Sequence, residues 1–360
     1  MAGVGSLIAA ASILVAAVCL SGCANLGYYW QSVTGHVAVM NAGKPVQDWL
    51  GDANTPDNTK RRLELSQRIR DYASDQLMLP DNASYRRYAD LRRRAAVWNV
   101  VAAPEFSLTL NTWCFPVVGC VGYRGYYNEA DAKAQAAVKQ AEGLEVDTYG
   151  VPAYSTLGYL NWAGGDPLLS TFINYPEGEL ARLIFHELSH QVLYVKDDTM
   201  FNESFATAVE RIGGAQWLAQ HGSTAARDEY VQFDQRRKAF RSLTMATRQQ
   251  LDKIYKISDA DINKSAMKKE AMKDFQSAYA ALKTQWGGFA GYDAWVAKAN
   301  NASFGALAAY DELVPQFEAL YAKQTGSSQE RWNKFYGACK AMVPLPRAER
   351  RAALAAAAAP

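Results

Sequence analysis

Residues 180–194 read LARLIFHELSHQVLY, and the interpretation of the whole chain starts from this stretch. It contains neither Gly nor Pro, so a helix is predicted over it. Pro176 comes just inside the expected start, and Glu177 and Glu179 fall in the first turn, where negative charge suits the positive end of the helix dipole.

Within this helix, His186, Glu187 and His190 form the pattern H-E-x-x-H. Residues at i and i+4 share a helix face, so both imidazoles can reach one Zn²⁺, with Glu187 beside them as the catalytic base. The chain has only four histidines, and chance would produce this pattern in about 0.2% of such chains at average residue frequencies. The alternative is a pair of core histidines beside a surface glutamate.

A third zinc ligand is expected from the next helix. Residues 196–199 interrupt the apolar pattern, which resumes over 200–210, and two helices joined by so short a turn lie antiparallel. The midpoint between His190 and Glu203 falls inside the turn, so Glu203 is predicted to come level with His190 and to bind the metal. By the same symmetry Thr207 comes level with His186 and could support it from behind.

The rival ligands are weaker. Asp197 and Asp198 suit turn or cap positions. Glu210 lies two turns beyond Glu203, and His221 stands at a helix end, where a cation is ordinary.

The N-terminal residues indicate export and lipid attachment. Residues 4–20 are apolar and uncharged, as in a signal-peptide core, and LSGC follows at 20–23, which resembles the lipobox of bacterial lipoproteins. Residues 1–22 are therefore expected to be a signal peptide and Cys23 the lipidated first residue of the mature chain. They contain no Lys or Arg, which departs from the usual basic start, and the alternative is an uncleaved single-pass anchor. Because Ala24 follows Cys23, the expected location is the bacterial cell envelope, at the outer membrane facing the periplasm.

The remaining cysteines leave two possibilities open. In an oxidising compartment Cys114 and Cys120 could close a small disulfide loop, which leaves Cys339 over. The alternative is two unpaired core cysteines.

The chain is expected to form an α+β fold that is mostly helical. A tether and membrane-proximal segment (23–56) precedes one peptidase domain (57–345), which has a sheet-containing part at about 97–175 and a helical part at about 176–342. Helices are predicted over 57–95 in two pieces broken near Pro80, over 129–145 and over a long segment near 223–285. The tail 346–360 is Arg/Ala-rich and is expected to be a frayed helix or a disordered segment. The expected strands form one small antiparallel sheet and lie at 98–101, 106–110, 117–127 and 147–157.

Composition excludes several classes of protein. The chain is 49% hydrophobic and 21% charged, which is ordinary for a globular protein and not for a disordered or polytopic membrane chain. The net charge is +2, from 38 basic and 36 acidic residues, so no nucleic-acid partner is expected.

The stretch 174–210, above all FHELSHQ followed by KDDTMFNESFA, resembles a family of bacterial aminopeptidases secreted as lipoproteins. GCVGYRGYY at 119–127 and DPLLST at 166–171 support the resemblance. Two His and one Glu with Glu187 as base resemble the gluzincin class. The resemblance implies a zincin-like fold, one Zn²⁺ and the removal of N-terminal residues from peptides in the cell envelope. The alternatives are an envelope endopeptidase or cell-wall amidase, and a non-catalytic scaffold.

The sequence does not decide which residues bind the substrate's α-ammonium group or which donate to the oxyanion. An aminopeptidase must hold the substrate's α-ammonium group, and Glu177, Glu179 and Asp166 are candidates, although helix-start and turn roles fit each of them equally well.

A donor to the developing oxyanion is also needed. Tyr154 and Tyr159 are the candidates, with Tyr126 and Arg124 behind them. The strand ending near Leu157 could pair with an extended peptide, and Trp113 and Trp162 could line the cleft or simply pack in the core.

Overall fold

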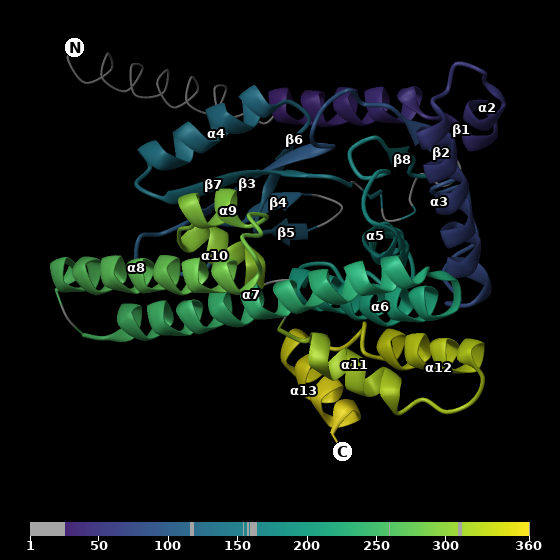
Figure 1. The fold of residues 1–360 in the computed structure, drawn as a ribbon. Coiled ribbons are helices and arrows are strands. Elements are labelled where there is room, and N and C mark those ends of the chain that lie inside the picture. The colour runs from purple at the N-terminus through teal and green to yellow at the C-terminus, as the bar shows by residue number, and fades with distance from the viewer. Residues whose placement is uncertain are drawn as a thin grey trace, which may run out of the picture.

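A computed structural model describes residues 26–115, 119–153, 155, 156, 158, 164–258, 260–308 and 312–359. Cys23, Tyr154, Leu157, Tyr159 and Trp162 lie outside these ranges. The described chain is mostly helical with small sheets, which confirms the predicted α+β class (Figure 1). No helix among the described residues is long and apolar enough to cross a membrane.

Helices make up most of the described chain. The first covers residues 26–42. The others are α2 (Val46–Gly51), α3 (Asp57–Asp75), α4 (Glu129–Ala141), α5 (Glu177–Ser189), α6 (Thr199–His221), α7 (Thr224–Lys256), α8 (Asp261–Gln285), α9 (Asp293–Lys298), α10 (Asn301–Ala308), α11 (Val314–Ala322), α12 (Ser328–Ala341) and α13 (Arg347–Ala358).

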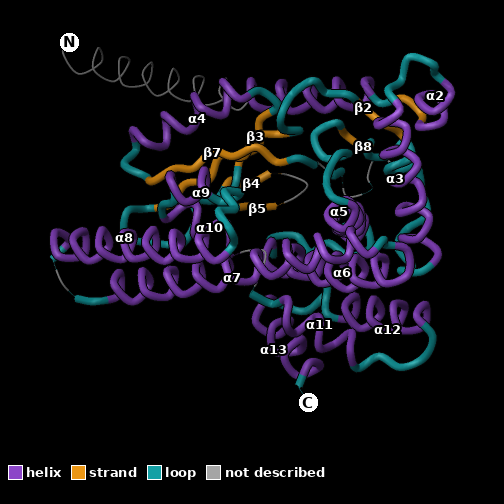
Figure 2. Tube along the Cα trace, viewed as in Figure 1, coloured by secondary structure: helices purple, strands orange, loops and turns teal. Residues whose placement is uncertain are grey.

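The strands form three separate sheets among the described residues, not the single sheet predicted. One sheet joins β1 (Lys44–Pro45), β2 (Arg87–Ala89) and β8 (Leu168–Leu169), and another joins β6 (Arg124–Tyr126), β3 (Val97–Ala103) and β7 (Glu145–Val151). The third pairs β4 (Trp113–Phe115) with β5 (Gly119–Val121). The β6-β3-β7 sheet is antiparallel throughout and lies between α4 and the α7–α8 pair (Figure 2).

The strand predicted at 106–110 is wrong. The chain turns after β3, where Ser107 N donates to Pro104 O and the Ser107 hydroxyl accepts from Thr109 N. These local bonds satisfy the backbone groups that a strand would have offered to a neighbour. Leu108 is buried against the core of α7, α8 and α10.

The second helical piece predicted before residue 95 is also wrong, because a buried arginine holds residues 80–84 in an irregular, turning conformation. Arg70 of α3 is fully buried, and its guanidinium donates to Ser84 O at 2.9 Å and to Pro80 O at 2.7 Å. The carbonyls are thereby satisfied by a side chain distant in the sequence, and β2 follows at Arg87. Helix 129–145 ends earlier than predicted, at Ala141, and the long segment 223–285 is two helices, α7 and α8, which lie side by side (Figure 1).

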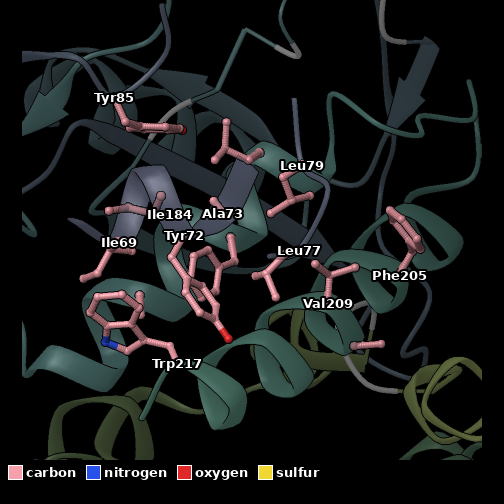
Figure 3. Close-up of a cluster of buried hydrophobic side chains, with 14 of the residues drawn as sticks. Ile69, Tyr72, Ala73, Leu77, Leu79, Tyr85, Ile184, Phe205, Val209 and Trp217 are labelled. Carbon is pink, nitrogen blue, oxygen red and sulfur yellow. The ribbon is translucent and has the colours of Figure 1, made fainter. Parts of the chain in front are cut away.

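The main core surrounds α5 and α6. Ile69 and Tyr72 of α3 meet Ile184 of α5 and Val209 and Trp217 of α6, all of them buried (Figure 3). Each fully buried aliphatic side chain contributes about 2 kcal/mol relative to an exposed one. The two helices that carry the H-E-x-x-H motif and Glu203 therefore lie within the main core of the described chain.

The C-terminal tail is the helix α13, which packs on the protein, so of the two expectations, a frayed helix or a disordered segment, the disordered segment is wrong. Arg350 of α13 is 6% exposed and pairs with Asp198, while Leu354 is fully buried. The Arg/Ala composition did not reveal this contact because the partner lies about 150 positions earlier in the chain. Figure 1 shows α13 beside α11, on the opposite side of α6 from α5.

Candidate metal centre and cavity

Helices α5 and α6 pack with their chains running in opposite directions. A Cβ built on Gly178 would meet Leu218, and one on Gly214 would meet the side chain of Arg182. A later position on α5 therefore contacts an earlier position on α6. Small residues let two helix backbones approach closely. A Cβ on Gly213 would likewise lie 3.1 Å from the ring of Phe185. This close approach places the polar side chains of the two helices opposite each other.

Helix α5 ends at Ser189 and not at Tyr194 as predicted, so residues 190–198 form the connection. Asn202 holds this connection in place: its side-chain amide donates to Val195 O and its side-chain oxygen accepts from Val195 N, both at 2.8 Å. His190 takes the capping position directly after α5 with helical backbone angles. It therefore still projects on the same face as His186.

His186, His190 and Glu203 converge, and their ligand atoms lie within 4.8 Å of one another. The two Nε2 atoms are 3.2 Å apart, Glu203 Oε2 is 3.2 Å from His186 Nε2, and it is 3.7 Å from His190 Nε2. Among the described residues this is the one group of three or more such side chains close enough to hold a metal ion. Asp197 and Asp198 are not part of it.

Glu210 is the partner of His186 that the sequence analysis missed. Its Oε2 accepts a hydrogen bond from His186 Nδ1 at 2.9 Å, and its Oε1 pairs with the guanidinium of Arg182. Burial alone would raise the pKa of Glu210, but Arg182 and His186 lower it to about 2. A carboxylate only accepts hydrogen bonds, so Nδ1 of His186 carries a proton, and its Nε2 atom faces His190 and Glu203.

Charged neighbours shift the pKa values of His186 and Glu203 in the direction opposite to that of burial. Burial alone would lower the pKa of His186, but hydrogen bonds and negative charge from Glu203 and Glu210 raise it well above its usual value. Burial would raise the pKa of Glu203, yet the two histidines hold it well below its usual range. The cluster thus consists of a carboxylate and two imidazole side chains, a residue set typical of zinc sites, and a metal that bound Nε2 of His186 would displace its proton.

Glu187 lies beside the cluster and lines the adjoining cavity. Burial raises the pKa of its carboxyl group, and the neighbouring His186 and His190 oppose that rise. Thr207 is buried on α6, but the side chain that meets Nδ1 of His186 is Glu210. The prediction for Thr207 assumed a four-residue turn, and the longer connection shifts the register so that position 210 comes level with position 186.

The cluster opens into a cavity of about 490 Å³. Its walls come from the helix at 26–42, the β4–β5 hairpin, β3, the stretch that contains β6 and the start of α6. Tyr123 and Tyr194 line it, and both are absent from the oxyanion donors predicted from the sequence. Burial raises the pKa of the Tyr123 hydroxyl far above its usual value, and the negative charge of Glu203 adds to the rise, so this hydroxyl stays protonated.

None of the residues predicted as oxyanion donors is found lining the cavity of the described chain. Tyr154 and Tyr159 lie outside the described residues. Tyr126 donates its hydroxyl proton to Gln135 Oε1, and the guanidinium of Arg124 stacks 4.0 Å from the ring centre of Tyr28. Neither Tyr126 nor Arg124 lines the cavity in the described chain, and neither does Trp113. Tyr123 could have been found because it stands in the same GCVGYRGYY stretch that carried the family resemblance.

Cys114 and Cys120 are joined in a disulfide, and Cys339 is free and buried. The bridge spans β4 and β5, and Phe115 and Val121 beside it line the cavity. Cys120 N donates to Asp197 Oδ1 at 2.6 Å, which ties the hairpin to the α5–α6 connection.

The three carboxylates considered for the substrate's α-ammonium group all have other partners. Glu177 accepts from Trp217 Nε1 at 3.0 Å, Glu179 pairs with Arg237 at 2.6 Å, and buried Asp166 accepts from Thr156 N at 3.0 Å. None of them lines the cavity of the described chain. Their helix-start and turn roles are the ones the structure displays.

Comparison with known proteins gives one match. A family model described as "Putative aminopeptidase" matches residues 27–354. No curated protein and no solved structure matches the chain significantly. Because the match spans nearly the whole chain, including the cluster and the cavity walls, the protein belongs to the family described as "Putative aminopeptidase".

Proposed function

We propose that this protein is a zinc-dependent peptidase of zincin-like fold that uses His186, His190 and Glu203 as metal ligands and Glu187 as general base. Membership of an aminopeptidase family indicates peptidase chemistry. The observation that carries the zinc assignment is the triangle of three ligand atoms at the floor of the cavity.

The spacing of that triangle fits zinc. Zn–N and Zn–O bonds of about 2.0–2.2 Å at tetrahedral angles place two ligand atoms about 3.3 Å apart. The observed separations are 3.2, 3.2 and 3.7 Å. Three protein ligands would leave one position of a tetrahedral zinc ion free for water or substrate, as a catalytic site requires.

Each residue of the site has its own role in the proposed hydrolysis of a peptide. Zinc, when bound, polarises the scissile carbonyl and lowers the pKa of a water to about 7. Glu187 takes a proton from the attacking water and later delivers it to the leaving amine. Glu210 and Arg182 hold His186 in one tautomer and orientation throughout.

Tyr123 is the best candidate for stabilising the oxyanion. Its hydroxyl remains protonated for the reasons given above, and it lines the cavity together with Glu187 and Glu203. A donor that meets the carbonyl oxygen as negative charge develops contributes several kcal/mol, because the site excludes water.

Removal of N-terminal residues from peptides is the activity that the family name favours. The second candidate is an envelope endopeptidase or cell-wall amidase. It is supported by the partners of Glu177, Glu179 and Asp166, which leave none of the three facing the cavity to hold a substrate's α-ammonium group.

We further propose that the protein acts in the bacterial cell envelope, attached through lipid on Cys23 and facing the periplasm. This rests on the apolar segment at 4–20 and on the LSGC run at 20–23. Mass spectrometry of the mature N-terminal peptide tests it: an intact segment 1–22 would contradict processing at Cys23.

The test of function is hydrolysis of a peptide library, with and without a metal chelator, by the wild type and by Glu187→Gln. We expect cleavage that the chelator abolishes and zinc restores, and a variant that binds zinc normally but turns over at least about 100-fold more slowly. Equal hydrolysis by the variant would refute the mechanism.

Matched peptides with free and acetylated N-termini separate the two candidate activities. An aminopeptidase loses its substrate when the amine is blocked, whereas an endopeptidase or amidase does not.

A further inference from the structure

The first helix, residues 26–42, has two faces of different character. One face packs on the protein: Val39 and Met40 are buried, and Gly35 lies so close to Tyr127 that a Cβ would overlap its ring. The other face carries large apolar side chains that are exposed. Figure 1 shows this helix, in purple, along the edge of the molecule opposite the C-terminal helices.

The exposed side chains form one stripe. Leu26 is 71% exposed, Trp30 71%, Val33 59% and Val37 46%, and Tyr29 at 43% lies beside them. Steps of four, three and four residues keep these positions on one side of a helix. Large apolar side chains gathered in this way mark a surface that meets another apolar phase.

The inner face of the same helix forms part of the wall of the catalytic cavity. Tyr28 and Ser32 line the cavity, and the ring of Tyr28 stacks on Phe115 with centres 5.6 Å apart. Gln31 fixes the helix to the sheet, because its side-chain oxygen accepts from Tyr127 N at 3.1 Å. The helix thus separates the cavity from the exposed stripe by about its own diameter, roughly 10 Å.

The stripe begins only three residues after Cys23, and this position indicates a lipid membrane as its partner. Only Ala24 and Asn25 stand between Cys23 and Leu26, so a lipid on Cys23 holds the start of the helix within about 10 Å of the membrane. Trp and Tyr favour the interfacial zone of a bilayer. Residues 26–43 contain no Lys, Arg, Asp or Glu, so nothing in the helix requires an anionic surface.

We propose that the stripe of Leu26, Trp30, Val33 and Val37 is a membrane-docking face that lies in the interface of a lipid bilayer. The acyl chains and the helix then act as two membrane signals, and together they hold the chain more firmly than one. Docking also fixes the orientation of the protein, with the catalytic cavity directly behind the helix that touches the membrane. The proposal rests on the membrane attachment proposed above, but it does not depend on peptidase activity.

The test places an environment-sensitive fluorophore on the mature, lipidated protein reconstituted into phosphatidylcholine vesicles. Val33→Cys carries the label on the stripe, and Val231→Cys of α7 is the matched control, a valine that is 50% exposed on another helix. The native thiols do not compete, because Cys114 and Cys120 are bridged, Cys339 is buried, Cys23 is expected to be acylated and Cys19 is expected to leave with the signal peptide. Peptide mass spectrometry checks that only the introduced cysteine is labelled.

We expect blue-shifted emission and quenching by spin-labelled lipid for the label at position 33, no such change at position 231, and little effect of 0.5 M salt (about a 4 Å Debye length). A label on Val37→Cys should lose its shift when Trp30→Ser and Val33→Ser are added, with the circular dichroism spectrum unchanged.

Two results would overturn the proposal. In the first, the label at position 33 stays as solvent-exposed as the one at 231 when vesicles are present. In the second, it is shielded without vesicles and sedimentation gives twice the monomer mass, which means that a second copy of the chain covers the stripe. Failure to find any peptidase activity would leave both measurements unaffected.

Discussion

Glu210 accepts a hydrogen bond from Nδ1 of His186 at 2.9 Å, and the same carboxylate pairs with Arg182. The bond joins α6 to α5 at the floor of the cavity. It fixes the proton of His186 on Nδ1 and so directs Nε2 toward His190 and Glu203. The geometry of the proposed metal centre therefore depends on a residue that does not bind the metal.

Glu210→Gln should weaken zinc binding by about 10-fold to 100-fold, because an amide carries no charge to oppose that of Arg182 or to strengthen His186 as a ligand. Competition with a fluorescent chelator measures the affinity. Glu318→Gln, which removes a partly exposed glutamate 3.7 Å from Arg211 on the surface, is the control and should bind zinc as the wild type does. An unchanged affinity for Glu210→Gln would show that His186 is oriented by packing alone.

Tyr123→Phe should lower kcat for peptide hydrolysis by about 100-fold while KM changes little, because the hydroxyl acts on charge that develops only in the transition state. Tyr126→Phe removes a hydroxyl that bonds to Gln135 away from the cavity and serves as the control. A larger effect of the control than of Tyr123→Phe would move the oxyanion site elsewhere in the chain.

Asp198→Ala should destabilise the fold by about 3 kcal/mol, because it leaves the buried guanidinium of Arg350 without its carboxylate and removes the cap of α6. Arg351 donates to the same carboxylate at 2.6 Å. Urea unfolding measures the loss. Asp252→Ala, which breaks the exposed pair with Lys256, should cost less than about 0.5 kcal/mol. Equal losses in the two variants would show that α13 contributes nothing through this contact.

Reduction of the disulfide should lower stability by about 2 kcal/mol, as expected for a short closed loop. Thermal unfolding with and without a phosphine reductant measures the change. The double variant Cys114→Ser and Cys120→Ser should unfold at the lower temperature in both conditions. Because Cys120 N donates to Asp197 beside the α5–α6 connection, we also expect weaker substrate binding after reduction. A reductant effect of equal size in the double variant would mean that the loss arises elsewhere.

The sequence predicted a helix correctly where a periodic pattern of nearby residues alone determines it. The H-E-x-x-H spacing and the apolar positions around it indicated α5, and Glu203 on the next helix does meet the histidines, although the symmetry that suggested it assumed a shorter connection than the structure has. Both inferences use the fixed periodicity of a helix, which does not depend on distant parts of the chain.

Predictions failed where a distant side chain replaced local backbone bonding. Arg70 donates to the carbonyls of Pro80, Asn82 and Ser84, and a second helix does not form there although the pattern favoured it. Asp198 pairs with Arg350 and holds α13, whose composition suggested a frayed helix or a disordered segment. The single predicted sheet is three sheets, because strand pairing is decided between segments far apart in sequence.

The sequence by itself determined which chemistry is available: two histidines four positions apart, a glutamate between them and a second glutamate one short connection later. Only the tertiary structure decided how that chemistry is supported. The nine-residue connection, the close approach at Gly213 and Gly214, and the pairing with Arg182 bring Glu210, and not Thr207, to His186. Helix periodicity is local and can be read from spacing, whereas the register between two packed helices is set by the side chains that let their backbones approach.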